Sequence, residues 1–331
     1  MKPLLLINHK RGTNLGWMEK ITKRNKKKDR KTFLRELRIG LSQKKKMIPS
    51  KFHYDLLGSQ YFEKITKQKD YYPTIKEKEI LKVISKKINS IFDEDLTFIE
   101  LGSGSVDKIR ILLNKRVKFY IPLDISFDFI VKTSKKLKKK FPKLKIKPTK
   151  IDYSKSFRIP KFTTQRKVCF FLGSSIGNFH NNEEKKFLKT LKKSLGKNNY
   201  LFVGVDLIKN KKIIERAYND KKGFSAKFNL NLITRMNKEF NTKLKINDFF
   251  YKSKFNNKLK CIESFVISKK KQSFYIGKTK FFLRRHEGIQ TEISKKFTLT
   301  SFKKLAKSSQ WKIQRFWLDK QRYFAIFLLK S

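Results

Sequence analysis

The sequence predicts an α/β protein with a mostly parallel sheet and a second, smaller α+β unit. From residue 77 to residue 207, apolar strand-like runs alternate with amphipathic helix-like runs, the pattern of a parallel sheet covered by helices on both faces. A glycine turn follows the first strand-like run and an acidic residue ends the second, at the edge where such sheets bind ligands. Beyond Leu207, strand-like runs follow one another without crossover helices, which indicates an antiparallel insertion.

The glycine turn is the first sign of a ligand site. Gly102 and Gly104 follow the apolar strand 98–101, and glycine lets the backbone adopt a positive φ and approach a ligand closely. Two glycines after a strand can also form an ordinary tight turn, so the motif by itself is weak. Asp124 ends the next strand, 117–123, about 20 residues further on, where an acid in such a fold reaches ribose hydroxyl groups. Together these residues predict a nucleoside-cofactor site.

The remaining elements are expected in chain order from their apolar periodicity. Before residue 208 the pattern predicts helices at 77–91, 125–141 and 183–195, a helix beginning at 109–113, and strands at 144–146, 168–172 and 200–205. The insertion should hold helices at 213–218 and 226–240 and strands at 262–267, 273–283 and 286–294. A last helix at 299–306 and strands at 311–317 and 323–329 are expected to return to the parallel-type unit.

The charge is the most unusual feature of the composition, because 83 Lys and Arg against 27 Asp and Glu leave a net charge of +56. Such a charge permits binding to nucleic acid or to an anionic membrane. A compositional origin is favoured, since no RNA-binding aromatic signature accompanies the lysines. The basic run 20–31 is interpreted as a solvated helix face or a mobile arm. We therefore expect at most non-specific binding of nucleic acid.

The length and the cysteine usage indicate an ordinary globular protein. A chain of 331 residues with 39% hydrophobic residues can bury a large core. The apolar stretch 4–7 is too short for a signal sequence, and no later segment approaches a membrane span. Cys169 and Cys261 lie in apolar runs and are expected to be reduced core residues, and with four scattered histidines they give no metal-ligand spacing. We expect a cytoplasmic monomer without a metal or a membrane partner.

Seven short motifs occur in an order that resembles one known family. They are Tyr54-Asp55-x-x-Gly58-Ser59, Tyr71-Tyr72-Pro73-Thr74, Glu100-Leu101-Gly102-Ser103-Gly104, Gly173-Ser174-Ser175-Ile176-Gly177-Asn178, Ala217-Tyr218-Asn219-Asp220, Phe228-Asn229-Leu230-Asn231 and Thr291-Glu292-Ile293-Ser294-Lys295-Lys296-Phe297. In this order they resemble the histidine-specific, S-adenosylmethionine (SAM)-dependent methyltransferase family, whose best-known members make the Nα-trimethylated histidine of the ergothioneine pathway. The resemblance covers residue 49 to the C-terminus.

The resemblance implies a fold, a division into domains and an activity. It implies a Rossmann-like class I methyltransferase domain at 77–207 and 297–331, a smaller substrate-binding domain at 49–76 and 208–296, and a basic N-terminal arm at 1–48. The implied activity is transfer of methyl groups from SAM to the α-amino group of an amino acid, with L-histidine as the expected substrate. The alternatives are an RNA or protein methyltransferase that uses the basic surface, a methyltransferase of another amino acid, and a non-enzymatic binding protein on the same scaffold.

The resemblance also implies roles for individual residues. Those aligned with the SAM site are Tyr54, Gly102, Lys108, Asp124, Asp152 and Tyr153. Those aligned with the amino-acid site are Tyr71, Gly173, Asn178, Tyr218, Glu292 and Ser294. Asp124 would bind the ribose diol, Asp152 would bind the adenine amino group, and Glu292 and Ser294 would face the imidazole. Asn178 and Tyr218 would hold the α-carboxyl and amino groups of the substrate, and Asn178 and Tyr54 are the expected catalytic residues, with Tyr54 a candidate proton acceptor.

Two positions depart from the pattern of the family. Tyr153 stands where relatives usually have phenylalanine, and the run Ile262-Glu263-Ser264 stands where the family commonly has Ile-Glu-Met. The serine leaves amine methylation intact but puts selectivity for histidine in doubt. The methyl group of SAM is already activated, so holding a neutral amine beside it supplies most of the acceleration, roughly 7–11 kcal/mol. Neither a metal nor a covalent intermediate is expected.

Overall fold

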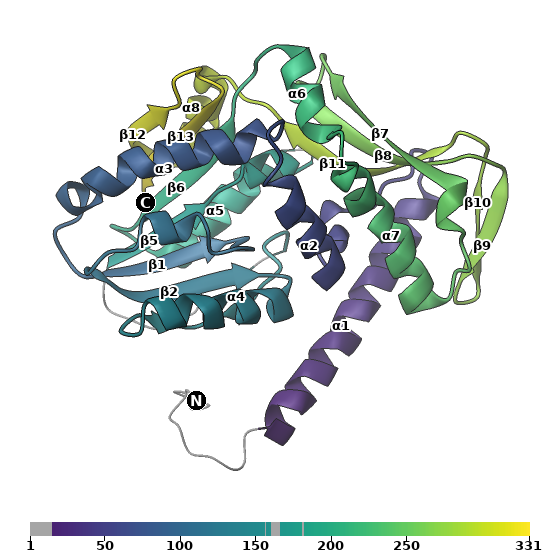
Figure 1. Cartoon of the computed structure of the whole chain (residues 1–331), viewed down its shortest axis with the longest axis horizontal. Helices are drawn as coiled ribbons and strands as arrows, with labels where there is room; N and C mark the ends of the chain where they lie inside the picture. The colour runs from purple at the N-terminus through teal and green to yellow at the C-terminus, as the bar shows by residue number, and fades with distance from the viewer. Residues whose placement is uncertain (1–14, 156, 160–165, 181) are drawn as a thin grey trace.

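The computed structural model describes residues 15–155, 157–159, 166–180 and 182–331, with side chains from residue 29 onward. A large sheet with helices against both faces lies beside a smaller unit of helices and antiparallel strands (Figure 1). The predicted α/β class with an antiparallel insertion is therefore confirmed.

The large sheet has the strand order β12-β13-β6-β5-β1-β2-β3, and β4 also pairs with β2. Its strands are β1 (Leu96–Leu101), β2 (Val117–Asp124), β3 (Lys145–Ile146), β4 (Thr149–Lys150), β5 (Arg166–Phe171), β6 (Tyr200–Asp206), β12 (Lys312–Leu318) and β13 (Phe324–Lys330). The pairs β1–β2, β1–β5 and β5–β6 are parallel. Strand order reverses between β1 and β5, so a ligand crevice is expected outside their carboxyl ends.

The last two strands differ from the prediction. They were expected to continue the parallel unit, but β13 lies antiparallel to both β6 and β12. Only five residues, 319–323, join β12 to β13, and so short a connection can form only an antiparallel hairpin.

Helices cover both faces of the sheet. One buried cluster contains Ile80 and Ile84 of α3 (Tyr72–Ile91) and Leu137 of α4 (Phe127–Lys140). The other contains Leu188 of α5 (Glu183–Leu195) and Phe302 of α8 (Leu299–Ser308). The two faces therefore carry separate cores, as the alternation of strand-like and helix-like runs predicted.

The helix expected after the glycine turn is only a short 3-10 helix, η2 (Ile109–Ile111). The chain turns at Asn114, whose Oδ1 accepts a hydrogen bond from Arg116 N at 2.9 Å. Because β2 already begins at Val117, the segment has no room for a second helical turn.

The smaller unit is built on the antiparallel sheet β11-β8-β7. Its elements are η1 (Ser50–His53), α2 (Leu56–Ile65), α6 (Lys211–Tyr218), α7 (Phe224–Phe240), η4 (Ile246–Asp248), β7 (Phe249–Asn256), β8 (Cys261–Ser268), β9 (Gln272–Ile276), β10 (Thr279–Leu283) and β11 (Gly288–Lys295). The sequence did not predict β7. The single strand expected at 273–283 is instead the hairpin β9–β10, because Gly277 turns the chain with φ +63°.

The N-terminal segment agrees with the prediction only in part, because the basic run 20–31 lies in a helix, one of its two interpretations. Residues 15–42 form one helix, α1 (Leu15–Ser42), rather than an arm apart from the fold. Phe33, Leu37 and Leu41 of α1 are buried in the core of the smaller unit, beside residues of α7. They lie four residues apart and so share one face of the helix. The second half of the expected arm 1–48 therefore packs on the smaller unit, and residues 1–14 lie outside the described part of the chain.

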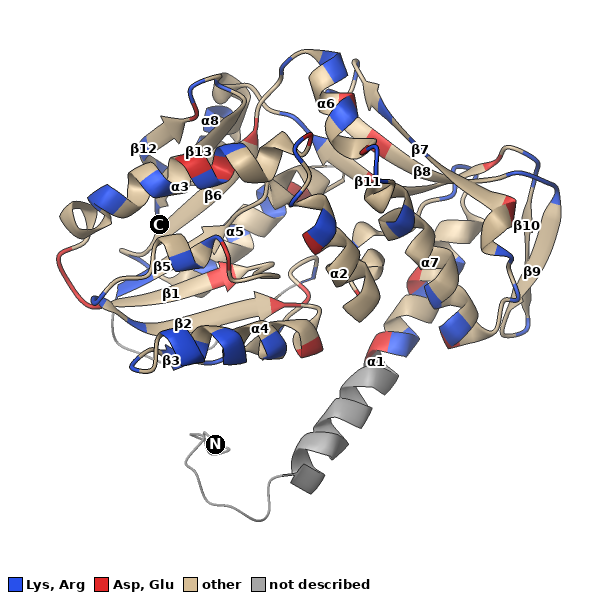
Figure 2. Cartoon of the chain, viewed as in Figure 1, with Lys and Arg blue, Asp and Glu red and all other residues tan. Residues whose placement is uncertain are grey.

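Lysine and arginine are distributed over elements of both units (Figure 2). Among the described residues, none of the helices is long and apolar enough to cross a bilayer. Both cysteines are buried and free.

We expect nucleic acid to bind weakly and without sequence preference, because lysines spread in this way offer phosphate contacts but no base readout. Affinity for a labelled RNA should fall at least about tenfold between 50 and 200 mM salt, measured by fluorescence polarisation. Tight binding to one RNA that survives 200 mM salt would contradict this expectation.

Candidate functional site

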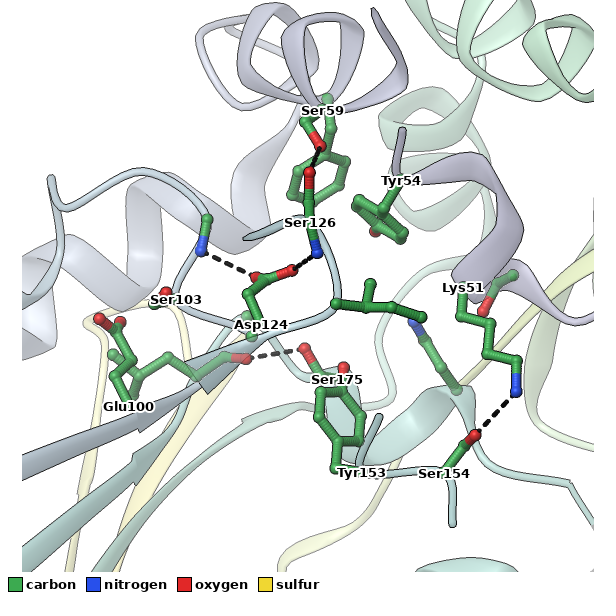
Figure 3. A pocket seen from close by; sticks show the side chains of 18 of the residues that line it. Lys51, Tyr54, Ser59, Glu100, Ser103, Asp124, Ser126, Tyr153, Ser154 and Ser175 are labelled. Carbon is green, nitrogen blue, oxygen red and sulfur yellow. Dashed lines mark hydrogen bonds between the residues drawn. The ribbon is translucent and has the colours of Figure 1, made fainter. Parts of the chain in front are cut away.

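A pocket of about 430 Å³ lies between the carboxyl ends of β1, β2 and β5 and the segments η1 and α2 (Figure 3). Its volume is within the roughly 300–1,000 Å³ of small-molecule sites. Nine of the twelve residues expected around SAM and the amino acid line it: Tyr54, Tyr71, Gly102, Lys108, Asp124, Asp152, Tyr153, Gly173 and Asn178. The other three, Tyr218, Glu292 and Ser294, are not part of this lining.

The glycine turn is held against the end of β2. Gly102 and Gly104 have φ values of +66° and +44°, which side chains rarely allow. Gly102 N donates to Leu123 O at 2.8 Å, and Gly104 N donates to Asp124 Oδ2 at 3.1 Å. A Cβ on Gly102 would lie 3.5 Å from the Tyr153 hydroxyl. The turn therefore presents bare backbone to the pocket, as a ligand cradle requires.

Asp124 ends β2 with its carboxylate fixed by two backbone donors (Figure 3). Oδ1 accepts from Ser126 N at 2.8 Å, and Oδ2 accepts from Gly104 N at 3.1 Å. Burial raises the pKa of Asp124, although these backbone hydrogen bonds act to lower it. Because each carboxylate oxygen has two lone pairs, one acceptor site remains on each. That arrangement suits two neighbouring hydroxyl groups.

Asp152, in the loop after β4, is tied to the smaller unit. Its Oδ2 accepts from Lys51 Nζ at 3.1 Å, and Oδ1 accepts from Ser154 Oγ at 2.5 Å. Lys51 also pairs with Glu36 of α1 at 3.0 Å. Burial acts to raise the pKa of Asp152, but Ser154 and Lys51 outweigh it, so the pKa is lowered and the group stays ionised. This edge of the pocket is thus closed by residues from both units.

A fully buried acid, Glu77 of α3, joins two predicted site residues. Its Oε2 lies 2.7 Å from Lys108 Nζ, and its Oε1 accepts from Gly173 N at 2.7 Å. Lys108 comes from the glycine turn after β1 and Gly173 from the turn after β5. The carboxylate of Glu77 therefore fixes the two turns that flank the reversal of strand order.

Tyr54 and Tyr71 form an aromatic wall on the side of the pocket nearest the smaller unit. Tyr54 packs edge-on against Phe228 and Phe62, with ring centroids 5.2 and 5.6 Å apart. Tyr71 packs edge-on against Phe62 at 6.3 Å. Asn178, at the end of η3 (Ser175–Asn178), also lines the pocket.

Both phenols are protonated at neutral pH. Burial, with a further contribution from Glu292, raises the pKa of Tyr54 well above its ordinary value. Burial likewise raises the pKa of Tyr71. Tyr54 can accept a hydrogen bond through its neutral oxygen, but it does not supply a phenolate base. The raised pKa disfavours proton uptake by Tyr54, and that expected role stays a prediction.

Tyr218 and Ser294 lie together outside the pocket lining. Tyr218, the last residue of α6, donates from Oη to Ser294 Oγ on β11 at 2.8 Å. Lys296 Nζ donates to both oxygens, at 2.9 Å to Tyr218 and 2.8 Å to Ser294, and pairs with Asp206 Oδ2 at 2.8 Å. Asp206, at the end of β6, also pairs with Lys209. The structure thus brings two predicted substrate residues onto one buried ionic network.

Glu292 lies on β11 directly opposite Ser264 of β8. Burial raises the pKa of Glu292 to about 7, although Lys296 and a hydrogen bond from Ser264 act to lower it. Ser264 is fully buried, and its Oγ lies 3.3 Å from Tyr251 Oη. The position where the family commonly has methionine therefore holds a hydroxyl next to the predicted imidazole-binding acid.

The raised pKa of Glu292 predicts a stability effect of known sign. The folded state holds this proton up to about pH 7, whereas an unfolded chain loses it near 4.5, so the favourable contribution is present below about pH 4.5 and lost as the pH rises through 7. Glu292→Gln, which is always neutral, should be more stable than wild type at pH 8 by up to about 3 kcal/mol and at pH 5.5 by about 1 kcal/mol. Urea unfolding at both pH values checks this.

Glu79→Gln is the matched control, because Glu79 is exposed on α3 and should change stability by less than about 0.5 kcal/mol at either pH. A Glu292→Gln protein that is less stable than wild type at pH 8 would show that Glu292 is not desolvated.

Sequence reasoning missed Glu77, Lys51 and Lys296. Glu77 had a detectable signal, because it lies on the same helical stripe as Ile80, Leu81 and Ile84, where an acid is out of place. Lys296 lies directly after β11, within the motif 291–297, and could have been included with the predicted polar pair for that reason. No local pattern marks Lys51, whose partners come from α1 and from the loop after β4.

Comparison with known proteins gives consistent results. The family model described as histidine-specific, SAM-dependent methyltransferase matches residues 33–331. A histidine N-alpha-methyltransferase of Mycolicibacterium smegmatis is 31% identical over 271 residues, which span 80% of this chain and 84% of that protein. A histidine N-alpha-methyltransferase of Mycobacterium tuberculosis is 29% identical over 303 residues, which span 89% of this chain and 93% of that protein. The match begins at residue 33, where α1 starts to pack on the smaller unit, and not at residue 49 as expected.

Proposed function

The chain belongs to the histidine-specific, SAM-dependent methyltransferase family, and we propose that it methylates the α-amino group of an amino acid, with L-histidine as the preferred acceptor. The observation that carries the choice of histidine is the pair Glu292 and Ser294, an acid and a hydroxyl on the same face of β11. The names of the two mycobacterial relatives support the same substrate.

We assign the glycine turn and the ends of β2 and β4 to the cofactor. Bare backbone at Gly102 and two spare acceptor sites on Asp124 fit a nucleoside, with Asp124 at the ribose diol and Asp152 at the adenine amino group. Lys108 and Tyr153 complete this side of the pocket. When bound, SAM supplies an activated methyl group that a neutral amine can accept directly.

The chain contributes chiefly by holding the acceptor amine. We assign Asn178 and Tyr218 to the α-carboxyl and amino groups of the substrate, and Tyr71 and Gly173 to the wall beside them. Tyr54 is proposed to accept a hydrogen bond from the amine, which loses its proton to water before attack. Orienting the two reacting groups in this way is worth roughly 7–11 kcal/mol, so no strong base is needed.

A different amino acid is the second candidate substrate, and Ser264 favours it. A fully buried serine opposite Glu292 leaves a more polar and smaller wall than the methionine common in the family. Such a wall suits an amino-acid substrate whose side chain places a polar group beside Ser264 and Glu292.

The direct experiment is incubation of the protein with SAM carrying a labelled methyl group and a panel of amino acids, followed by mass spectrometry. Labelled Nα-methylated histidine as the main product supports the proposal, and the mass shift also gives the number of methyl groups transferred. Labelling of another amino acid with histidine unchanged would support the second candidate. Labelling of RNA or protein alone would contradict both.

A further inference from the structure

Lys296 is a fully buried cation behind the proposed substrate site. Its ammonium group lies 2.8 Å from Asp206 Oδ2, 2.9 Å from Tyr218 Oη and 2.8 Å from Ser294 Oγ. An ammonium group has three N–H donors and no acceptor, so these three oxygens use all of its hydrogens. Lys296 is therefore held in one orientation by residues from β6, α6 and β11.

The negative charge of Asp206 does not by itself balance the positive charge of Lys296. Asp206 is already paired with Lys209, whose Nζ lies 2.5 Å from Oδ1, so Lys296 brings a second positive charge to one carboxylate. Buried charges are costly unless other charges balance them. The charge of Lys296 acts on Glu292, and above about pH 7, where Glu292 is ionised, its carboxylate brings the charges of these four groups to zero.

The hydrogen bonds around Lys296 also determine which way the Ser294 hydroxyl points. Ser294 Oγ accepts one hydrogen bond from Lys296 and one from Tyr218. A serine oxygen has two acceptor sites, so both are used and only its own hydrogen remains. Towards a ligand, Ser294 can therefore only donate.

Glu292 has the opposite polarity. When ionised, a carboxylate only accepts hydrogen bonds, and Glu292 lies two residues before Ser294 on the same face of β11. A ring that fits both must offer one N–H and one bare nitrogen. The neutral imidazole ring does so, whereas an imidazolium ring has two N–H groups and a phenyl ring has neither.

We propose that Lys296 is a positioning residue that makes the site select the neutral imidazole, by fixing Ser294 as a donor beside the acceptor Glu292. This inference rests on the proposed function, because it takes the imidazole to lie against these two residues. A site with fixed donors and acceptors discriminates strongly, since a mismatched ring leaves buried polar groups unpaired.

Lys296→Met tests the inference, because methionine has a similar length and leaves Asp206 paired with Lys209. The KM for histidine should rise roughly 10- to 100-fold, as expected when one or two well-placed hydrogen bonds lose their partner. The kcat at saturating histidine and the Kd of SAM should stay within about threefold of wild type. If Lys296 had only a structural role, Lys296→Met would lower kcat and weaken the binding of both histidine and SAM.

Lys209→Met is the matched control. Lys209 is a second buried lysine on the same carboxylate, but its recorded partners are Tyr72, Asp206 and a backbone carbonyl rather than Tyr218 or Ser294. It should leave the KM for histidine within about threefold. An unchanged KM in Lys296→Met, or the same rise in both variants, overturns the inference while the proposed function stands.

Two further outcomes are informative. If the wild-type protein does not methylate histidine at all, the proposed function fails and this inference fails with it.

If Lys296→Met does not fold, Lys296→Gln carries the test, since the amide keeps two donors but loses the charge. It should raise the KM for histidine at least fivefold, and a KM equal to that of wild type overturns the inference.

Discussion

Asp124→Ala is expected to weaken SAM binding by roughly 100-fold or more. The carboxylate is fixed by Gly104 N and Ser126 N, which leaves one acceptor site on each oxygen for the ribose diol. Two hydrogen bonds to a charged group contribute about 3 kcal/mol or more, which is roughly 150-fold in Kd. The loss should appear in the Kd of SAM measured by calorimetry. It should also appear for S-adenosylhomocysteine, because the ribose is common to both ligands.

Asp128→Ala is the control for this prediction. Asp128 is an exposed acid four residues further on, in the first turn of α4, and does not line the pocket. It should leave the Kd of SAM within about twofold, although it removes the same charge from a position only four residues away. An Asp124→Ala protein that stays folded and binds SAM as tightly as wild type would sink the assignment of the cofactor site to this edge of the sheet.

The glycine turn and Asp124 could be predicted because their geometry is local. The turn is specified by two glycines directly after a buried strand, and Asp124 by the end of the next strand. Neighbouring parallel strands end at the same edge of the sheet, so these residues must meet wherever the rest of the chain lies. The structure brings Gly104 N to 3.1 Å from Asp124 Oδ2 for this reason.

Contacts between distant segments could not be predicted in this way. Lys51 bridges Glu36 of α1 and Asp152, and Lys296 reaches Asp206, 90 residues earlier in the chain. A lysine in a chain with 83 Lys and Arg gives no local sign that it is buried. These residues become identifiable only when the two units are packed together.

The missed elements have a similar cause. Strand β7 has only its first residue and Phe255 buried, so its sequence shows little of the alternation typical of a strand. In α1, the apolar residues Phe33, Leu37 and Leu41 lie at helical spacing but follow a long basic run, which favoured a solvated helix face or a mobile arm. In both segments the packing partner, rather than the local pattern, decides the structure.

Glu292→Ala is expected to lower kcat/KM for histidine by about 1,000-fold while the Kd of SAM stays within about twofold. The carboxylate is proposed to accept the imidazole N–H in a partly buried site, and alanine would leave that N–H without an acceptor. An unpaired buried polar group costs about 1–3 kcal/mol, and the lost charge-assisted bond adds about 1.5–3 kcal/mol, so the sum is near 4 kcal/mol. The effect should be confined to histidine, because the residues assigned to SAM all lie outside β11.

Ser264→Met, assayed beside Glu292→Ala, separates selectivity for histidine from the general ability to methylate an amine. Ser264 lies directly opposite Glu292 and donates to it a hydrogen bond that acts to lower the pKa of Glu292. Methionine would restore the residue common in the family and cover the ring with an apolar surface, so the KM for histidine should fall. If wild-type protein methylates another amino acid, ignores histidine and is indifferent to Glu292→Ala, then Glu292 and Ser294 do not bind an imidazole. Methylation of an amino acid would then rest on the cofactor pocket and on the residues assigned to the α-carboxyl and amino groups.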